Sequence, residues 1–128
     1  GLANQAGIKY NRFKKQKKKK EDKMNKLEKF TLFIGLNDKD SKQQEINTID
    51  CYKILMNLFL KNGVDCTISE SQGFYTHLDG TFTIEKSLRV EILFSSKEKI
   101  YSLCDSIKIL LNQESVAVQR DLVESELY

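Results

Sequence analysis

The stretch "GFYTHLDGTFTIEKSLRVEIL", residues 73–93, decides the fold because it predicts a β-hairpin. At its centre Asp79-Gly80 tolerates the positive φ angles that tight hairpin turns require. Beyond the turn, apolar and polar residues alternate, as in a strand with one buried face. Lys86 interrupts the apolar set, and we expect it near the rim of the sheet. The apolar set is Phe82, Ile84, Leu88, Val90, Ile92 and Phe94, and the polar set is Thr83, Glu85, Ser87, Arg89 and Glu91.

Two further strands are predicted beside this hairpin, whose own first strand begins before the quoted stretch. Residues 30–36 place Phe30, Leu32, Ile34 and Leu36 on one face, and residues 64–70 form the strand that enters the hairpin. Gly73 predicts a bulge or bend where that strand continues. Residues 115–122, "SVAVQRDL", form the last strand.

Two amphipathic helices are predicted between the strands, over residues 42–61 and 97–111. In each of them apolar residues recur at helical spacing, so that one stripe faces the sheet. Asp40 or Ser41 has the spacing of an N-terminal cap, and Asn62-Gly63 supplies the C-terminal stop.

The element order β-α-β-β-α-β predicts a single α+β domain with the ferredoxin-like arrangement, an antiparallel sheet with two helices on one face. We expect this domain to span residues 27–128. Residues 1–26 form a flexible basic N-terminal arm, because they lack a repeating apolar pattern.

The arm carries most of the positive charge. Residues 1–29 have a net charge of +8 and residues 30–128 a net charge of −5, so a basic arm precedes an acidic body. Lysines on such an arm neutralise phosphates without reading sequence, and aromatic rings stack on bases. A solubility tail or an acidic protein partner would explain the arm as well. The predicted nucleic-acid-binding residues are Lys9, Tyr10, Arg12, Phe13, Lys14, Lys15, Lys17, Lys18, Lys19 and Lys20.

The polar face of the sheet is acidic and poor in aromatic residues, which makes it a bad platform for RNA. Glu85, Arg89 and Glu91 share this face on the strand after the hairpin turn. We therefore predict that these three residues contact a basic protein partner or a second copy of the chain.

No catalytic constellation, metal site or cofactor is predicted. His77 is the single histidine and precedes a turn, and no motif supplies it with a nucleophile or an orienting partner. Cys51, Cys66 and Cys104 are widely spaced among apolar residues, as expected for reduced, buried thiols rather than zinc ligands. No secretory signal or membrane-spanning run is recognised, so the expected location is the cytoplasm.

The hairpin resembles the central hairpin of small ferredoxin-like bacterial proteins of the DUF3574-like group. The pattern is a Gly-x-aromatic, a loop with Asp-Gly and then Glu-x-Ser, carried here by Gly73, Tyr75, Asp79, Gly80, Glu85 and Ser87. The resemblance covers residues 30–122 and supports the fold, and it implies no catalytic residues. In size, and in pairing a basic arm with an acidic body, the chain is also similar to type II anti-CRISPR proteins from mobile elements.

These observations predict a non-enzymatic inhibitor or accessory protein of a mobile element that engages nucleic acid or a ribonucleoprotein. Its concrete form is an anti-CRISPR protein against a Cas9-type effector, which holds its guide heteroduplex in a positively charged channel. The alternative is a small-molecule-binding regulatory domain of the same fold, dimeric, with its site between protomers.

Overall fold

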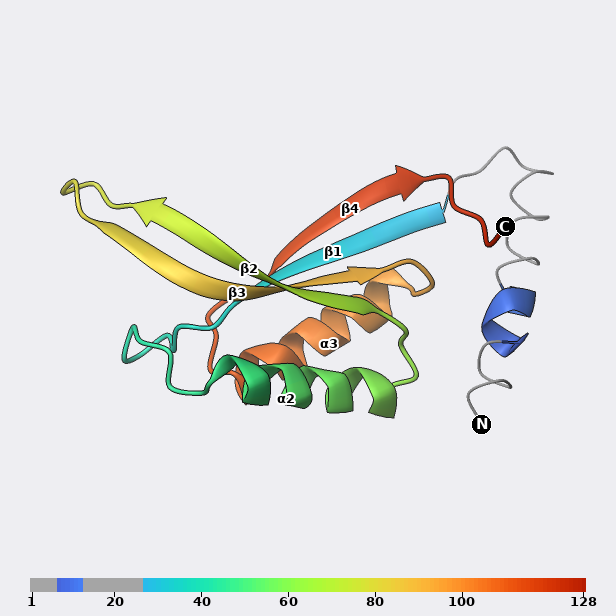
Figure 1. Cartoon of the computed structure of the whole chain (residues 1–128), viewed down its shortest axis with the longest axis horizontal. Helices are drawn as coiled ribbons and strands as arrows, with labels where there is room; N and C mark the ends of the chain where they lie inside the picture. Colours follow the sequence, from blue (N-terminus) through green and yellow to red (C-terminus); the bar gives the residue numbers. More distant parts are fainter. Residues whose placement is uncertain (1–6, 13–26) are drawn as a thin grey trace.

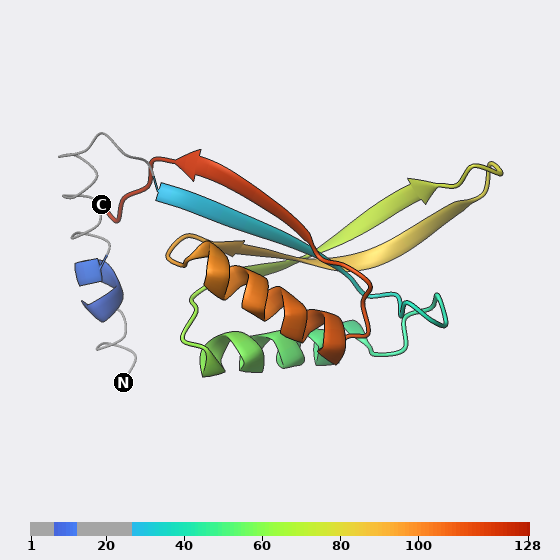
Figure 2. The ribbon, with the colours of Figure 1, turned by 180° about the vertical axis from the view of Figure 1, so that it is seen from behind.

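The computed structural model describes residues 7–12 and 27–128. Four antiparallel strands form one sheet in the order β2-β3-β1-β4. Two helices lie side by side on one face of this sheet (Figure 1 and Figure 2). The predicted α+β, ferredoxin-like arrangement is confirmed. The elements are β1 Leu27–Gly35, α2 Thr48–Lys61, β2 Thr67–Thr76, β3 Phe82–Ile92, α3 Lys97–Leu110 and β4 Ala117–Val123.

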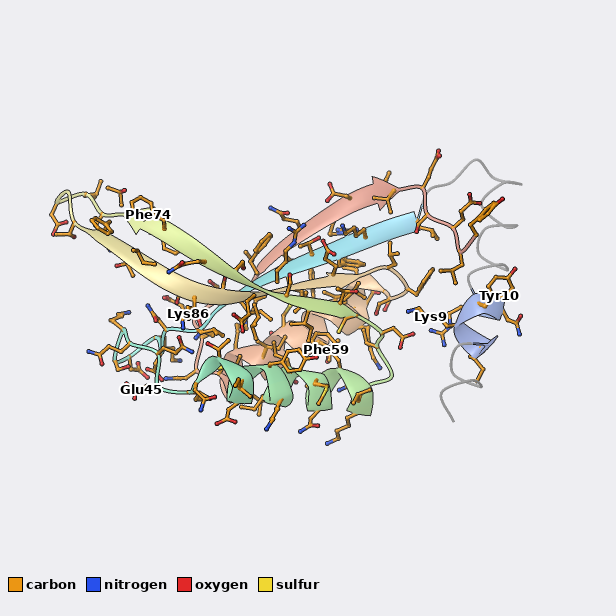
Figure 3. All side chains as sticks on the ribbon, viewed as in Figure 1. Lys9, Tyr10, Glu45, Phe59, Phe74 and Lys86 are labelled. Atoms are coloured by element: carbon orange, nitrogen blue, oxygen red, sulfur yellow. The ribbon has the colours of Figure 1, made fainter. Side chains whose placement is uncertain are left out.

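The core lies between the sheet and the helices. Leu32 of β1 pairs with Val90 of β3, and both side chains are fully buried against the helices. Phe59 is among the largest buried side chains, and it rises from α2 toward the sheet (Figure 3). Burying a ring of this size contributes about 2–3 kcal/mol of folding free energy. The predicted alternation therefore places the apolar face of β3 against the helices over residues 88–92.

Helix α2 begins later than predicted. Its N-terminal cap is Asn47, whose side chain accepts a hydrogen bond from the Asp50 amide at 2.8 Å. Lys42 has φ = 63°, a left-handed conformation that cannot belong to an α-helix. Asp38 accepts hydrogen bonds from the amides of Asp40 and Ser41, so this segment is a turn. Residues 36–47 are consequently a long loop beside the end of β1.

The predicted bulge at Gly73 is absent from the structure. The register between β2 and β3 runs without a break from Thr67↔Glu91 to Thr76↔Phe82, and Gly73 pairs with Glu85. The turn after it is as predicted: Gly80 has φ = 87°, and the His77 amide donates to the Thr81 carbonyl oxygen at 2.7 Å. Gly73 instead leaves space on the polar face of the sheet, which the side chain of Tyr75 occupies.

The far end of the β2–β3 hairpin extends past the helices (Figure 1). On the helix-side face of this extension, Phe74 and Phe82 contact each other with ring centroids 5.1 Å apart. Without a helix below them, Phe74, Phe82 and Ile84 remain 63%, 59% and 52% exposed. Their apolar pattern is that of a buried strand, but the helices end before reaching them.

Residues 7–12 of the predicted flexible arm form one short helical segment. Its Lys9 lies beside the body of the protein, with its ammonium 4.0 Å from a carboxylate oxygen of Asp65 (Figure 3). Phe13 and the lysines at 14, 15 and 17–20 lie outside the described residues. Within residues 7–12 and 27–128, no helix has the length and apolar character needed to cross a membrane.

Candidate functional site

A pocket of about 910 Å³ opens on the polar face of the sheet, where β1 ends and the 36–47 loop begins. Leu32 and Ile34 of β1 face the core, so Phe33 and Gly35 face the opposite side, into this pocket. Most of the residues in its wall are polar, and the wall contains both signs of charge. It is formed by Phe33, Gly35, Asn37, Asp38, Lys39, Lys42, Ser71, Gln72, Gly73, Tyr75, His77, Thr83, Glu85, Ser87, Gln113, Glu114, Ser115 and Ala117.

Glu85 is the best-defined charged group of the pocket. Its carboxylate lies directly above the α-carbon of Gly35 on the neighbouring strand, in space that a Cβ atom would occupy. The backbone amide of Asn37 donates a hydrogen bond to Glu85 Oε2 at 2.9 Å. Among the described residues Glu85 forms no ion pair, so its negative charge remains available to a cationic ligand.

Tyr75 adopts a matching arrangement on β2. Its ring folds back along the strand over Gly73, where an added Cβ would lie 2.6 Å from the phenol oxygen. Gly73 is the register partner of Glu85. The phenol and the carboxylate therefore each lie above a glycine on the same face of the sheet, over the two strands that flank β3. Because both side chains lie low over a glycine, this part of the polar face is recessed.

Hydroxyl and imidazole groups continue the polar wall along the hairpin. The hydroxyl oxygens of Ser71 and Ser87 are 2.6 Å apart, so one donates to the other. His77 Nε2 and the Thr83 hydroxyl are joined by a hydrogen bond of 2.7 Å. These groups suit the hydroxyls and ring nitrogens of a polar ligand better than an apolar one.

Two lysines border the pocket on the loop side. Lys39 and Lys42 bring positive charge to the rim opposite the hairpin. Lys42 keeps its left-handed backbone because its amide donates to the Asp38 carbonyl oxygen at 2.9 Å. A non-glycine residue held at positive φ is uncommon, and such residues cluster at functional sites.

The loop is fastened to the turn after α3. Asn112 Nδ2 donates to Asp38 Oδ2 at 2.8 Å and to Asp40 Oδ2 at 2.9 Å. The hydrogen bond from Asn112, together with those from the Ser41 and Asp40 amides, lowers the pKa of Asp38 below its usual value. These hydrogen bonds, which we call the Asn112 clamp, favour an ionised Asp38. They also fix the position of the loop at the edge of the pocket.

The three residues predicted to bind a protein partner do not form one site. Glu85 lies in the pocket, whereas Arg89 Nη2 and Glu91 Oε1 form an ion pair of 2.9 Å farther along β3. Lys29 approaches the same Glu91 oxygen at 3.3 Å, and the Arg89 guanidinium lies 5.6 Å from the Phe33 ring centroid. Arg89 and Glu91 thus neutralise each other, and partner binding by these residues stays a prediction.

The cysteines do not come together as ligands. All three are free thiols, with Cys51 and Cys104 buried in the core and Cys66 partly buried. Burial raises the pKa of each thiol, and a neighbouring aspartate, such as Asp105 beside Cys104, raises it further. No group of three or more possible metal ligands occurs in the described part of the chain.

Sequence reasoning missed most of this site. Tyr75 and Gly73 were recognised only as parts of a hairpin pattern, and Gly35 and Gln113 were not singled out. The one available signal was a glycine at the end of an apolar strand, followed after one leucine by Asn and Asp. The meeting of Gly35 with Glu85 depends on strand pairing across 50 residues of sequence, which no local pattern contains.

Comparison with known proteins places the fold among solved structures. No protein-family model and no curated protein matches the chain. A phage SAM lyase without ligand is similar over 80% of this chain and 93% of its own, with 23% identity and a TM-score of 0.59. The phage SAM lyase in complex with S-methyl-5'-thioadenosine gives 23% identity and a TM-score of 0.58, over 81% and 94% of the two chains.

A second kind of protein shares the same fold. The periplasmic divalent cation tolerance protein CutA from Archaeoglobus fulgidus is 13% identical, with a TM-score of 0.51 over 77% of this chain and 87% of its own. At these identities the likenesses establish the architecture.

The comparisons correct the functional prediction. A non-enzymatic anti-CRISPR or accessory protein was expected, but the chain shares its fold with a lyase and with cation tolerance proteins. The prediction that the protein is not an enzyme is contradicted by the same lyase. Nucleic-acid binding by the arm receives no support, and of its proposed residues only Lys9, Tyr10 and Arg12 are described. The likeness to the DUF3574-like group stays untested.

Proposed function

We propose that this protein is an enzyme that cleaves S-adenosylmethionine, as a lyase, to release S-methyl-5'-thioadenosine. The observation that carries the proposal is the carboxylate of Glu85, which is fixed above Gly35 by the Asn37 amide inside a large polar pocket. The shared fold with a phage SAM lyase, solved also with S-methyl-5'-thioadenosine, supports this choice of substrate.

The groups around the pocket match the parts of this substrate. S-adenosylmethionine joins an adenosine to a sulfonium cation and to an amino acid with one ammonium and one carboxylate. The rings of Phe33 and Tyr75 offer aromatic faces to adenine. Glu85 complements a positive charge of the amino-acid part, and Lys39 and Lys42 complement its carboxylate. The pocket therefore carries negative charge on one side and positive charge on the other, which complements a ligand that carries both signs.

The chemistry breaks the bond between the sulfonium sulfur and the side-chain Cγ of the methionine part. Sulfur takes the electron pair and becomes a neutral thioether, which leaves as S-methyl-5'-thioadenosine. The remaining fragment closes onto its own carboxylate to form a lactone, with no proton released, or loses a proton from Cβ to form an alkene. Both routes consume no water, as a lyase requires. In the second route Glu85 is the base that accepts the proton.

Because charge is neutralised in the transition state, the protein contributes mainly by holding the substrate in a reactive conformation. Groups that are fixed before the substrate arrives cost no reorganisation when it reacts. Glu85 meets this condition, since its carboxylate is already held by a backbone amide.

The test is direct. Purified protein is incubated with S-adenosylmethionine, and the products are separated by chromatography and identified by mass. S-methyl-5'-thioadenosine is expected, with either a lactone or an alkene as the second product. Glu85→Gln, which has the same shape without the charge, should lower turnover at least about tenfold. Glu70→Gln, on β2 outside the pocket, is the matched control and should turn over normally. No release of S-methyl-5'-thioadenosine by the wild-type chain would refute the proposal.

Divalent cation tolerance, the description of the CutA neighbours, is not proposed for this chain. The pocket combines carboxylates with two lysines, and residues 7–12 and 27–128 contain no cluster of metal-ligating side chains.

A further inference from the structure

Gln113 occupies an unusual position for a glutamine that follows a helix. It is only 8% exposed and borders the pocket beside the 36–47 loop. Its Nε2 donates to the Asn37 carbonyl oxygen at 2.8 Å and to the Leu111 carbonyl oxygen at 3.1 Å. Both partners are acceptors, so the NH₂ group must face them and the amide has one orientation.

Asn37 needs this support because the sheet does not hold it. The last ladder hydrogen bond of β1 toward β3 runs from the Leu36 amide to the Lys86 carbonyl oxygen, at 3.0 Å. Asn37 comes one residue later. The backbone carbonyl oxygen of Asn37 accepts a hydrogen bond from Gln113, while its backbone amide donates to Glu85 Oε2 at 2.9 Å. A continuous chain of hydrogen bonds thus connects the turn after α3 to the carboxylate in the pocket.

We propose that Gln113 is a positioning residue for Glu85, acting through Asn37. This inference rests on the proposed lyase function for its catalytic consequence, but its structural content can be measured without that function. A glutamate side chain has several rotatable bonds, so the carboxylate stays above Gly35 only while the Asn37 amide is correctly aimed. Releasing Asn37 would let the carboxylate move by about 1 Å, a displacement that can cost about 100-fold in rate.

The informative substitution is Gln113→Met, which keeps the length of the side chain and removes both donors. Gln113→Glu is the second variant, since its carboxylate would face two carbonyl oxygens and could not donate. We expect either change to lower kcat at least about tenfold. The Kd for S-methyl-5'-thioadenosine should change less than about twofold, because this product lacks the amino-acid part that Glu85 contacts.

Asn112→Gly provides the matched control. Asn112 has φ = 47°, which glycine adopts readily, and its side-chain amide donates to Asp38 and Asp40, whereas that of Gln113 donates to Asn37. If Gln113 acted only by stabilising the loop, Asn112→Gly and Gln113→Met would lower kcat alike. We expect Asn112→Gly to lower the melting temperature and, because it frees the loop that carries Lys39 and Lys42, to raise KM, while kcat stays within about twofold.

Two measurements decide the inference. In the first, Gln113→Met is combined with Glu85→Gln; a residue that acts through Glu85 should have no further effect on kcat once the carboxylate is gone. In the second, NMR follows hydrogen exchange of the Asn37 amide, which should accelerate about tenfold in Gln113→Met. Unchanged exchange at Asn37 would overturn the positioning role whatever the activity, as would additive losses in kcat. Faster exchange in a protein that never cleaves S-adenosylmethionine would keep the positioning role and refute the lyase function.

Discussion

Replacing Gly35 with Ala is the sharpest test of the carboxylate site. An added Cβ at this position would lie 2.5 Å from Glu85 Oε1, 2.7 Å from its Cδ and 2.8 Å from its Oε2. Carbon and oxygen atoms cannot approach so closely, so the carboxylate must leave. The backbone itself accepts alanine, because Gly35 lies outside the left-handed region.

The size of the effect on stability follows from what the carboxylate loses. It gives up one hydrogen bond, from the Asn37 amide at 2.9 Å, and moves as the end of a flexible side chain toward solvent. Such a loss costs about 1–2 kcal/mol of folding free energy. In a domain of this size that corresponds to a fall in melting temperature of about 4–8 °C.

Activity should fall much more than stability. With Glu85 displaced, the pocket loses its fixed negative charge, and we expect kcat/KM for S-adenosylmethionine to drop about 10- to 100-fold. Thermal unfolding and the release of S-methyl-5'-thioadenosine are the two assays. The matched control is Gly35→Ala in a Glu85→Ala background, where the clash no longer exists and the second change should be nearly silent. A Gly35→Ala protein with normal melting temperature and full turnover would refute the seating of Glu85 on Gly35.

Three further predictions concern stability. Because the pKa of Asp38 is lowered in the folded protein, its hydrogen bonds with Asn112 and the loop amides stabilise the fold above the ordinary carboxyl pKa, and this stability is lost as pH falls from about 4 toward the folded-state pKa. Asp38→Asn should therefore flatten this part of a curve of unfolding free energy against pH. An unchanged curve would contradict the role of these hydrogen bonds. Cys104→Ala removes a buried thiol and should destabilise by about 1 kcal/mol in urea unfolding without any effect of chelators, whereas unfolding by a chelator would reveal a metal. Asn47→Ala removes the cap of α2 and should cost about 1 kcal/mol in the same assay, while Ser41→Ala, at a position first expected to cap, should cost less because Ser41 lies in the loop before the helix.

Much of the fold could be predicted because its determinants are local. The Asp79-Gly80 turn and the alternation along β3 set the hairpin, and their signals come from neighbouring residues. The start of α2 was mispredicted because capping residues are abundant before it. Asp40, Ser41 and Asn47 all have the required side chains, and only the left-handed backbone at Lys42 decides that the helix begins after the last of them.

The candidate site could not be predicted because its parts meet through long-range pairing. Glu85 was placed correctly on the polar face, but its role was assigned to a protein partner, together with Arg89 and Glu91. Those two residues form an ion pair with each other, whereas the Glu85 side chain extends across to β1 and lies over a glycine. The choice between an ion-paired surface and a charged pocket thus depends on which residue faces Glu85 from another strand.

A recessed site on an antiparallel sheet needs a physical origin, because the side chains of such a face normally rise to similar heights. Gly35 and Gly73 supply it here by leaving space on two strands, β1 and β2, that flank β3. Glu85 and Tyr75 fold into this space, so their polar ends lie low on the sheet while the lysines of the 36–47 loop and the hairpin residue His77 border the opening. Gly73→Ala should therefore push the Tyr75 ring outward, just as Gly35→Ala displaces Glu85. Adenine binding should then weaken without a change in the carboxylate, which the Kd for S-methyl-5'-thioadenosine would report. An unchanged Kd in Gly73→Ala would mean that Tyr75 does not contact the adenosine part, and the ligand would have to lie nearer the loop.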